Sequence, residues 1–256
     1  SDQWQWNNTG AGNGKIGADV RAEKAWDITT GGLTAAGDTI VVCVIDDGID
    51  LQHEDLAANI WYNNGEIPNN GIDDDGNGFV DDFNGWNFNT QNDNVSVGSH
   101  GVNVSGMIGA VGNNNMGVTG INWNVKIMNI VLSDFTEAAI VECYDYPYQS
   151  RLAYNNSHGD KGAFVVSVNM SNGIDYGNPD DAPIWCGFYD IMGEAGILNV
   201  AATSNQNINV DVDGDLPTGC TSQYLISVGR TDKNDNYAPC GYGPISIDLG
   251  APGVNI

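Results

Sequence analysis

One segment constrains the fold more than any other: the apolar run Thr39-Ile-Val-Val-Cys-Val-Ile45, which stops at Asp46-Asp47-Gly48. A run of β-branched residues without polar alternation is typical of a strand buried on both faces, as in a parallel sheet. Phe164-Val-Val-Ser-Val-Asn-Met170 is a second such run. The same reasoning predicts further strands over 125–132, 197–202 and 224–230.

Helical patterns alternate with these strands. Helices are predicted over 18–28, 136–155 and 182–195, and the small residues of 98–110 predict a helix packed closely on the sheet. This alternation indicates an α/β fold with a mainly parallel central sheet flanked by helices. No linker divides the chain, so we predict one domain over 1–256. Segment 59–94, rich in Asn, Asp and Gly, is predicted to be a loop too polar to pack a core.

Charge limits the partners of this chain. Eight Lys and Arg against 33 Asp and Glu give a net charge of −25. Such a chain is not attracted to phosphate backbones, so a nucleic-acid partner is not expected, whereas calcium suits the abundant carboxylates. No unbroken apolar stretch reaches the roughly 18 residues of a membrane span. Scarce Lys with abundant Gly and Asn favours a secreted protein, although no signal-peptide pattern opens the sequence.

The five cysteines leave several arrangements open. Cys43 lies in an apolar run and is predicted to be a buried thiol. The other four allow two disulfides in three pairings, or four free thiols; they are Cys143, Cys186, Cys220 and Cys240. A bridge between Cys186 and Cys220 would brace the segment around Asn205. The spacings typical of zinc sites are absent from the sequence.

Three polar residues stand where a parallel sheet places its functional groups. Asp46 ends the first strand, His100 begins the small-residue helix 54 residues later, and Asn205 follows the strand 197–202. Ligands of parallel sheets bind at the carboxyl ends of the strands. An acid, a histidine and an amide donor in this order match one of the known chain orders of serine-hydrolase sites. The alternatives are a turn aspartate, a structural histidine and an ordinary loop asparagine.

Six motifs in order resemble the subtilisin-like serine peptidases over nearly the whole chain. Val44-Ile-Asp-Asp-Gly-Ile49 is similar to the aspartate motif of that family, and Ser99-His-Gly-Val-Asn-Val-Ser-Gly106 to its histidine motif. The remaining four are similar to the substrate-binding strand, the oxyanion segment and two later landmarks: Ser167-Val-Asn-Met-Ser-Asn-Gly173, Val200-Ala-Ala-Thr-Ser-Asn205, Ile226-Ser-Val-Gly229 and Asp248-Leu-Gly-Ala-Pro-Gly-Val254.

The resemblance implies a subtilisin-like three-layer fold and a secreted serine endopeptidase with an Asp/His/Ser triad. Asp46 would orient the base, His100 would be the base, and Asn205 would donate to the oxyanion. A polypeptide substrate would pair with two segments as an added strand. The substrate-binding residues implied in this way are Ser171, Asn172, Gly173, Ala202, Thr203 and Ser204.

The sequence departs from the family where the nucleophile is expected. Gly-Thr-Ser, which the family carries downstream of Ala-Pro-Gly, is absent from the chain. We therefore expect the domain to be incomplete at its C-terminus, with the Ser supplied from outside 1–256 by a second chain or a C-terminal segment. Val102 and Asn103 replace family residues beside the base, and Thr203-Ser204 is expected to narrow the first specificity pocket. The alternative is a catalytically inactive subtilisin-like scaffold that binds peptide or a protein partner.

An acidic loop carries the clearest metal signal. Asp73-Asp-Asp-Gly-Asn77-Gly78 repeats the opening of a calcium loop, although Asn84 stands where a full EF-hand has Glu. The predicted calcium ligands are Asp73, Asp75, Asn77, Asp81 and Asp82. The alternative is an acidic surface turn. Asp211-Val-Asp-Gly-Asp215 is a weaker second candidate, and a calcium-dependent adhesive module would explain these loops but not the ordered Asp, His and Asn.

Overall fold

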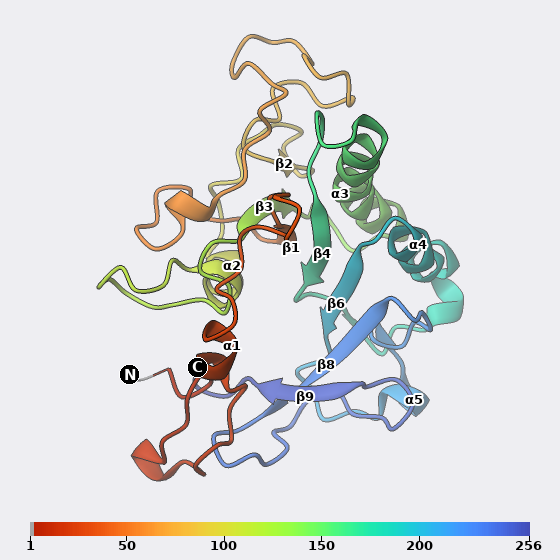
Figure 1. The fold of residues 1–256 in the computed structure, drawn as a ribbon. Coiled ribbons are helices and arrows are strands. Elements are labelled where there is room, and N and C mark those ends of the chain that lie inside the picture. Colours follow the sequence, from red (N-terminus) through yellow and green to blue (C-terminus); the bar gives the residue numbers. More distant parts are fainter. Residues whose placement is uncertain (1–2) are drawn as a thin grey trace.

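A seven-stranded sheet forms the centre of the computed structural model, which describes residues 3–256. Its strand order is β2-β3-β1-β4-β6-β8-β9, and every pair of neighbours is parallel (Figure 1). The strands are β1 (Val41–Asp46), β2 (Trp86–Asn87), β3 (Lys126–Val131), β4 (Val165–Met170), β6 (Leu198–Ala202), β8 (Leu225–Thr231) and β9 (Leu249–Pro252). The predicted parallel sheet is confirmed.

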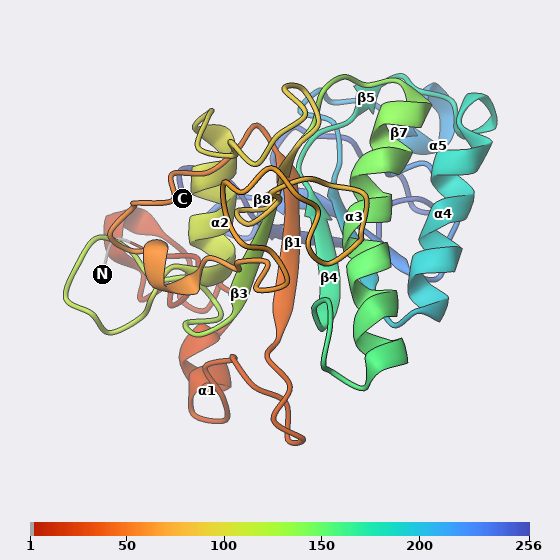
Figure 2. The same cartoon turned by 90° about the horizontal axis from the view of Figure 1, so that it is seen from above.

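Helices cover both faces of this sheet. The helix α2 (His100–Gly109) packs on β1 and β3 from one side, while α3 (Glu137–Ser157) and α4 (Pro183–Glu194) pack on the other (Figures 1 and 2). The result is the predicted three-layer arrangement. The shorter elements are η1 (Ala11–Asn13), α1 (Ala22–Trp26), η2 (Ala57–Asn59), β5 (Ile174–Asp175), η3 (Pro179–Asp181), α5 (Val210–Asp213) and β7 (Asp215–Leu216), with β5 and β7 forming a small antiparallel pair.

The strand β1 shows why its sequence is continuously apolar. Cys43 and Ile45 belong to the hydrophobic core on the α3 side, whereas Val44 belongs to the core on the α2 side. Alternate side chains of a strand point to opposite faces, so a strand between two cores needs apolar residues at every position. The two cores hold β1 in the interior of the sheet, between β3 and β4, with Asp46 at its carboxyl end.

Two expectations for the N-terminal half were wrong. The helix predicted over 18–28 is limited to α1 (Ala22–Trp26). Asp19 accepts the Arg21 N–H at 2.8 Å, and Arg21 has a left-handed φ of 54°, so a local turn takes the place of the first helical turn.

The second wrong expectation was that segment 59–94 is a loop too polar to pack a core. It contains β2, and its Trp86 and Phe88 are buried in the core. Phe79 packs against Trp86 with ring centroids 5.0 Å apart and against Tyr146 of α3 at 5.1 Å. A few aromatic side chains are enough to tie this polar loop to the sheet and to α3.

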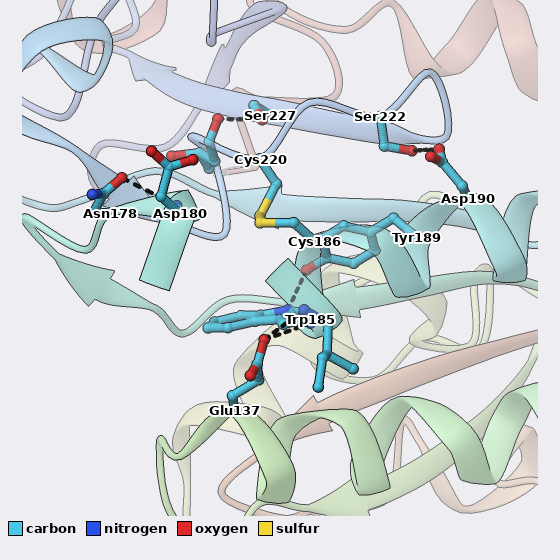
Figure 3. Close-up of a disulfide and its surroundings, with 12 residues drawn as sticks. Glu137, Asn178, Asp180, Trp185, Cys186, Tyr189, Asp190, Cys220, Ser222 and Ser227 are labelled. Carbon is cyan, nitrogen blue, oxygen red and sulfur yellow. Dashed lines mark hydrogen bonds between the residues drawn. A yellow bond between two sulfur atoms is a disulfide. The ribbon is translucent and has the colours of Figure 1, made fainter. Parts of the chain in front are cut away.

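One disulfide joins α4 to the segment before β8 (Figure 3). Cys186 and Cys220 form it, and their Cα atoms lie 5.2 Å apart. Cys43 is a buried free thiol as predicted, and Cys143 and Cys240 are also buried free thiols, so the described residues adopt one bridge, an arrangement between the alternatives of two bridges and none. No helix among residues 3–256 has the length and apolar character needed to cross a bilayer.

Candidate active site

Asp46 and His100 form a hydrogen-bonded pair at the carboxyl end of β1. The His100 Nδ1 atom lies 2.8 Å from Asp46 Oδ1 and 3.0 Å from Oδ2. The Asp46 side chain is 2% exposed, whereas the His100 side chain is 54% exposed. A buried carboxylate on Nδ1 fixes the imidazole tautomer and leaves Nε2 as the basic nitrogen. This is the arrangement of an oriented general base.

Two glycines, Gly48 and Gly101, allow α2 to pack directly against the turn after β1. A Cβ on Gly101 would lie 2.1 Å from the Gly48 carbonyl oxygen and 3.1 Å from Asp46 Cβ. Gly48 has a φ of 124°, and a Cβ there would lie 2.2 Å from the Val97 carbonyl oxygen. Any side chain at either position would push His100 away from Asp46.

Asp47, in the turn after β1, caps the first turn of α2. Its Oδ2 accepts the N–H groups of Ser99 and His100, each at 3.1 Å, and its Oδ1 accepts the Gly101 N–H at 2.7 Å. These hydrogen bonds lower the pKa of Asp47 against the opposing effect of partial burial. The carboxylate satisfies otherwise unpaired helix N–H groups and so fixes the backbone at His100.

The Asp47 cap makes a pH-dependent contribution to stability. We expect Asp47→Ala to lower the free energy of unfolding by about 1–2 kcal/mol at pH 7. Because the folded-state pKa lies below the ordinary value of 3.8, this contribution is present above about pH 4 and is lost as the pH falls further. Urea denaturation at pH 7 and pH 3 measures it, with the exposed Asp50→Ala as control. An Asp47→Ala difference that does not shrink at pH 3 would contradict the charged cap.

The predicted substrate-binding segments emerge side by side. Ser171 to Gly173 follow β4, and Ala202 to Ser204 end and follow β6, which is the parallel neighbour of β4. Thr203 and Ser204 are largely buried, and both bind the Asp215 carboxylate, Thr203 through Oγ1 at 3.2 Å and Ser204 through its N–H at 3.1 Å. Thr203 Oγ1 is therefore turned toward Asp215 in the interior.

Asn205 follows this second segment and is exposed. Its Oδ1 accepts a hydrogen bond from Arg230 Nη1 at 3.2 Å. Asn205 and Arg230 line one groove of about 440 Å³ with Ser171 and Ala202. The side of this groove toward α2 is apolar and is formed by Val104, Met107 and Ile108.

His100 lacks a nucleophilic partner among residues 3–256. Its hydrogen bonds go to Asp46 through Nδ1 and to Asp47 through its backbone N–H. No hydroxyl group in this part of the chain binds Nε2. Among the described residues, the Asp46–His100 pair therefore has no hydroxyl group hydrogen-bonded to its free imidazole nitrogen.

The model of the subtilase family (Peptidase_S8) matches residues 37–255. The chain belongs to the subtilase family. This match confirms the resemblance that the six sequence motifs indicated. The fold of the chain is the α/β fold of subtilases.

Relatives of this subtilase include curated peptidases. "Subtilisin-like protease 1" of Plasmodium berghei is 30% identical over 93% of this chain and 40% of its own length. "Extracellular basic protease" of Dichelobacter nodosus is 29% identical over 93% of this chain and 39% of its own length. The chain thus spans about two fifths of these relatives. A solved protease of Pseudoalteromonas arctica shares the fold, with a TM-score of 0.66 and 22% identity over 98% of this chain and 70% of the other.

The acidic loop of this subtilase brings three carboxylates together. Glu66, Asp73 and Asp75 each place one oxygen within 4.8 Å of the others. Glu66 is buried and accepts the N–H groups of Asp74 and Asp75 at 2.9 and 3.1 Å. No Lys or Arg of residues 3–256 forms an ion pair with this cluster. Clustered hard oxygen ligands without a positive partner fit Ca²⁺.

Two other predicted calcium ligands, Asp81 and Asp82, lie outside this group of three carboxylates. Asp81 accepts the N–H groups of Asn70 and Gly71. Asp82 is fully buried, accepts Tyr146 Oη–H at 2.5 Å and Asn77 Nδ2 at 2.9 Å, and has its pKa raised to about 6 by burial. Sequence reasoning missed Glu66, because no fixed spacing connects it to the Asp-x-Asp-x-Asn pattern.

The second acidic stretch has other uses. Asp211 accepts the N–H groups of Ile245 and Ser246, and Asp213 accepts that of Asn209. Asp215 binds Thr203 and Ser204, as described above. Asp211, Asp213 and Asp215 therefore each bind a different part of the chain around the predicted substrate-binding segments.

Proposed function

We propose that this subtilase is a secreted serine endopeptidase that hydrolyses peptide bonds in polypeptides. The observation that carries the proposal is the Asp46–His100 pair, in which a buried carboxylate holds Nδ1 and leaves Nε2 open. A base held in this way removes the proton of an attacking hydroxyl, and the carboxylate stabilises the imidazolium that forms. The Asn205 amide is assigned as a donor to the developing oxyanion.

The nucleophilic Ser is assigned to a segment outside residues 1–256, either a C-terminal segment or a second chain. Two features support this assignment. His100 Nε2 has no hydroxyl partner among residues 3–256, and an apolar groove separates α2 from β6 and β8. Val104, Met107 and Ile108 on one side and Val200 and Val228 on the other would be covered by an added apolar element.

Substrate is assigned to the edges that follow β4 and β6. An extended peptide would pair with Ser171–Gly173 on one side and with Ala202–Ser204 on the other, so that main-chain hydrogen bonds supply affinity. Secretion is supported by the disulfide and by extracellular and cell-wall-associated proteases among the relatives.

Covalent labelling tests the proposal. The complete protein is treated with a fluorophosphonate, which reacts with an activated serine hydroxyl, and the labelled peptide is mapped by mass spectrometry. We expect one labelled Ser outside residues 1–256 and no labelling in His100→Ala. A folded, complete protein that takes up no label would overturn the peptidase and favour a non-catalytic scaffold that binds peptide or a protein partner.

Calcium is assigned to the loop at Glu66, Asp73 and Asp75, with Asn77, Asp81 and Asp82 supporting the loop around it. Bound Ca²⁺ would neutralise the carboxylate repulsion and cross-link the segment between β1 and α2. The loop lies outside the Asp46–His100 contacts, so the ion is given a structural rather than a chemical role.

Removal of calcium is expected to lower the melting temperature. At a Ca²⁺ concentration 100 times the Kd the ion adds about 2.7 kcal/mol. For a chain of this size the corresponding rise in Tm is about 5–10 °C. Calorimetry with Ca²⁺ and with chelator measures it. Glu66→Gln should abolish most of the difference, whereas the exposed Glu54→Gln should retain it. An equal Tm with and without chelator would contradict the calcium site.

A further inference from the structure

The amide of Asn205 can serve an oxyanion only in one of its two orientations. The Nδ2 atom donates hydrogen bonds, whereas Oδ1 would repel a developing negative charge. Asn205 is exposed and follows the end of β6, so solvent alone would not choose between the orientations. Some neighbouring group has to select the orientation that presents Nδ2.

Arg230 of β8 supplies this selection. Its Nη1 donates to Asn205 Oδ1 at 3.2 Å, while its Nε and Nη2 donate to the Pro239 carbonyl oxygen at 3.1 and 2.5 Å. The guanidinium is thus held on its other side by a single backbone oxygen. Because a guanidinium has donors and no acceptor, only the oxygen of the Asn205 amide can face it.

The donor end of the same amide remains unused. Among residues 3–256, Asn205 Nδ2 has no hydrogen-bond acceptor, and Asn205 and Arg230 both line the groove that also contains Ser171. An amide whose oxygen is bound to a cation is polarised, so its N–H groups become stronger donors.

We propose that Arg230 is a positioning residue that holds the Asn205 amide in its donating orientation and strengthens it as an oxyanion donor. This inference rests on the proposed peptidase function. Arg230 need not touch the substrate: it acts through Oδ1 of Asn205. Its contribution is therefore expected in the transition state and not in substrate binding.

The test is a double-mutant cycle in the complete protein, with kcat and KM measured on a peptide substrate. Without Arg230 the amide regains its rotamers and both orientations, so Arg230→Met should lower kcat by about tenfold with KM within about twofold. Asn205→Ala alone should lower kcat by about 10²–10³-fold. The double variant should be no slower than Asn205→Ala, because Arg230 has nothing left to position.

Three further measurements sharpen the cycle. Arg230→Lys keeps the charge without the two-sided hold on Pro239 and should recover part of kcat. A peptide aldehyde, whose adduct places an oxyanion at the site, should lose affinity for Arg230→Met by the same factor as kcat/KM. Lys24→Met, which removes an exposed cation from α1, should leave all values unchanged.

The outcomes separate the two proposals. A normal kcat in Arg230→Met beside a strongly reduced kcat in Asn205→Ala would overturn the role of Arg230 and leave the peptidase standing. The role of Arg230 would also be overturned if Arg230→Met lowered kcat by the same factor in the unmodified protein and in Asn205→Ala. Equal factors would indicate a general structural effect. If Asn205→Ala is fully active, or the unmodified protein hydrolyses no peptide, the oxyanion assignment falls and the inference falls with it.

Discussion

Replacement of Asp46 by Asn should lower kcat by about 10⁴-fold with little change in KM, the effect known for an orienting carboxylate made neutral in a serine-peptidase triad. The Asn amide would donate to Nδ1 and so place the imidazole proton on Nε2, where it blocks proton transfer from the nucleophile. The substitution preserves size in a site that is 2% exposed, so packing should be retained. Steady-state kinetics of the complete protein measure the effect.

Asp50→Asn is the matched control for this experiment. The substitution removes one negative charge from the same turn. The Asp50 side chain is exposed and accepts a hydrogen bond from the Gln52 N–H rather than from His100. We expect kcat within about twofold of the unmodified protein, because surface charges away from the reacting groups have small effects. A loss of less than tenfold in Asp46→Asn would sink the triad assignment.

The Cys186–Cys220 bridge is expected to have the largest effect on stability. It closes a loop of sequence separation 34, so the chain-entropy relation gives about 3–4 kcal/mol. The loop contains β6, the proposed substrate-binding residues Ala202, Thr203 and Ser204, and Asn205. Replacing both cysteines by Ala should lower Tm by roughly 10 °C.

Reductant provides the matched comparison. Both proteins are melted with and without dithiothreitol: the unmodified protein should fall to the Tm of the double variant, and the double variant should not respond. Around the bridge, Ser222 Oγ donates to Asp190 Oδ1 at 2.6 Å and Glu137 accepts the Trp185 N–H at 3.0 Å (Figure 3). If the Ser222–Asp190 hydrogen bond alone held α4 to the segment before β8, the two proteins would have the same Tm with and without reductant.

Sequence reasoning succeeded where the signal is local. The strand ending at Asp46 and the helix that begins near His100 can be recognised from runs of a few residues, because burial on two faces and close helix packing impose local patterns. The alternation of these patterns predicted a mainly parallel sheet and five of its seven strands, whereas β2 lies in a segment predicted to be a loop and β9 was not predicted.

The remaining features depend on contacts between distant residues. Asp47 reaches the N–H groups of residues 52 to 54 positions later, and Arg230 reaches Asn205 across 25 positions. The motifs that contain Asp47 and Asn205 do not predict these contacts, since capping and amide orientation are decided by how strands and helices pack. Glu66 joined the acidic cluster for the same reason, and the pairing of Cys186 with Cys220 was one of several that the sequence allowed.

The acidic loop has a consequence for the acid and the base on either side of it. Asp46 and His100 meet across a sequence separation of 54, and the cluster at Glu66, Asp73 and Asp75 lies within that interval. The entropy lost on closing a flexible loop grows with its length, so any cross-link inside the interval shortens the free chain. A cation bound there would reduce the conformational entropy lost when Asp46 and His100 come together, without contacting either residue. Its effect would be a higher melting temperature rather than a higher kcat.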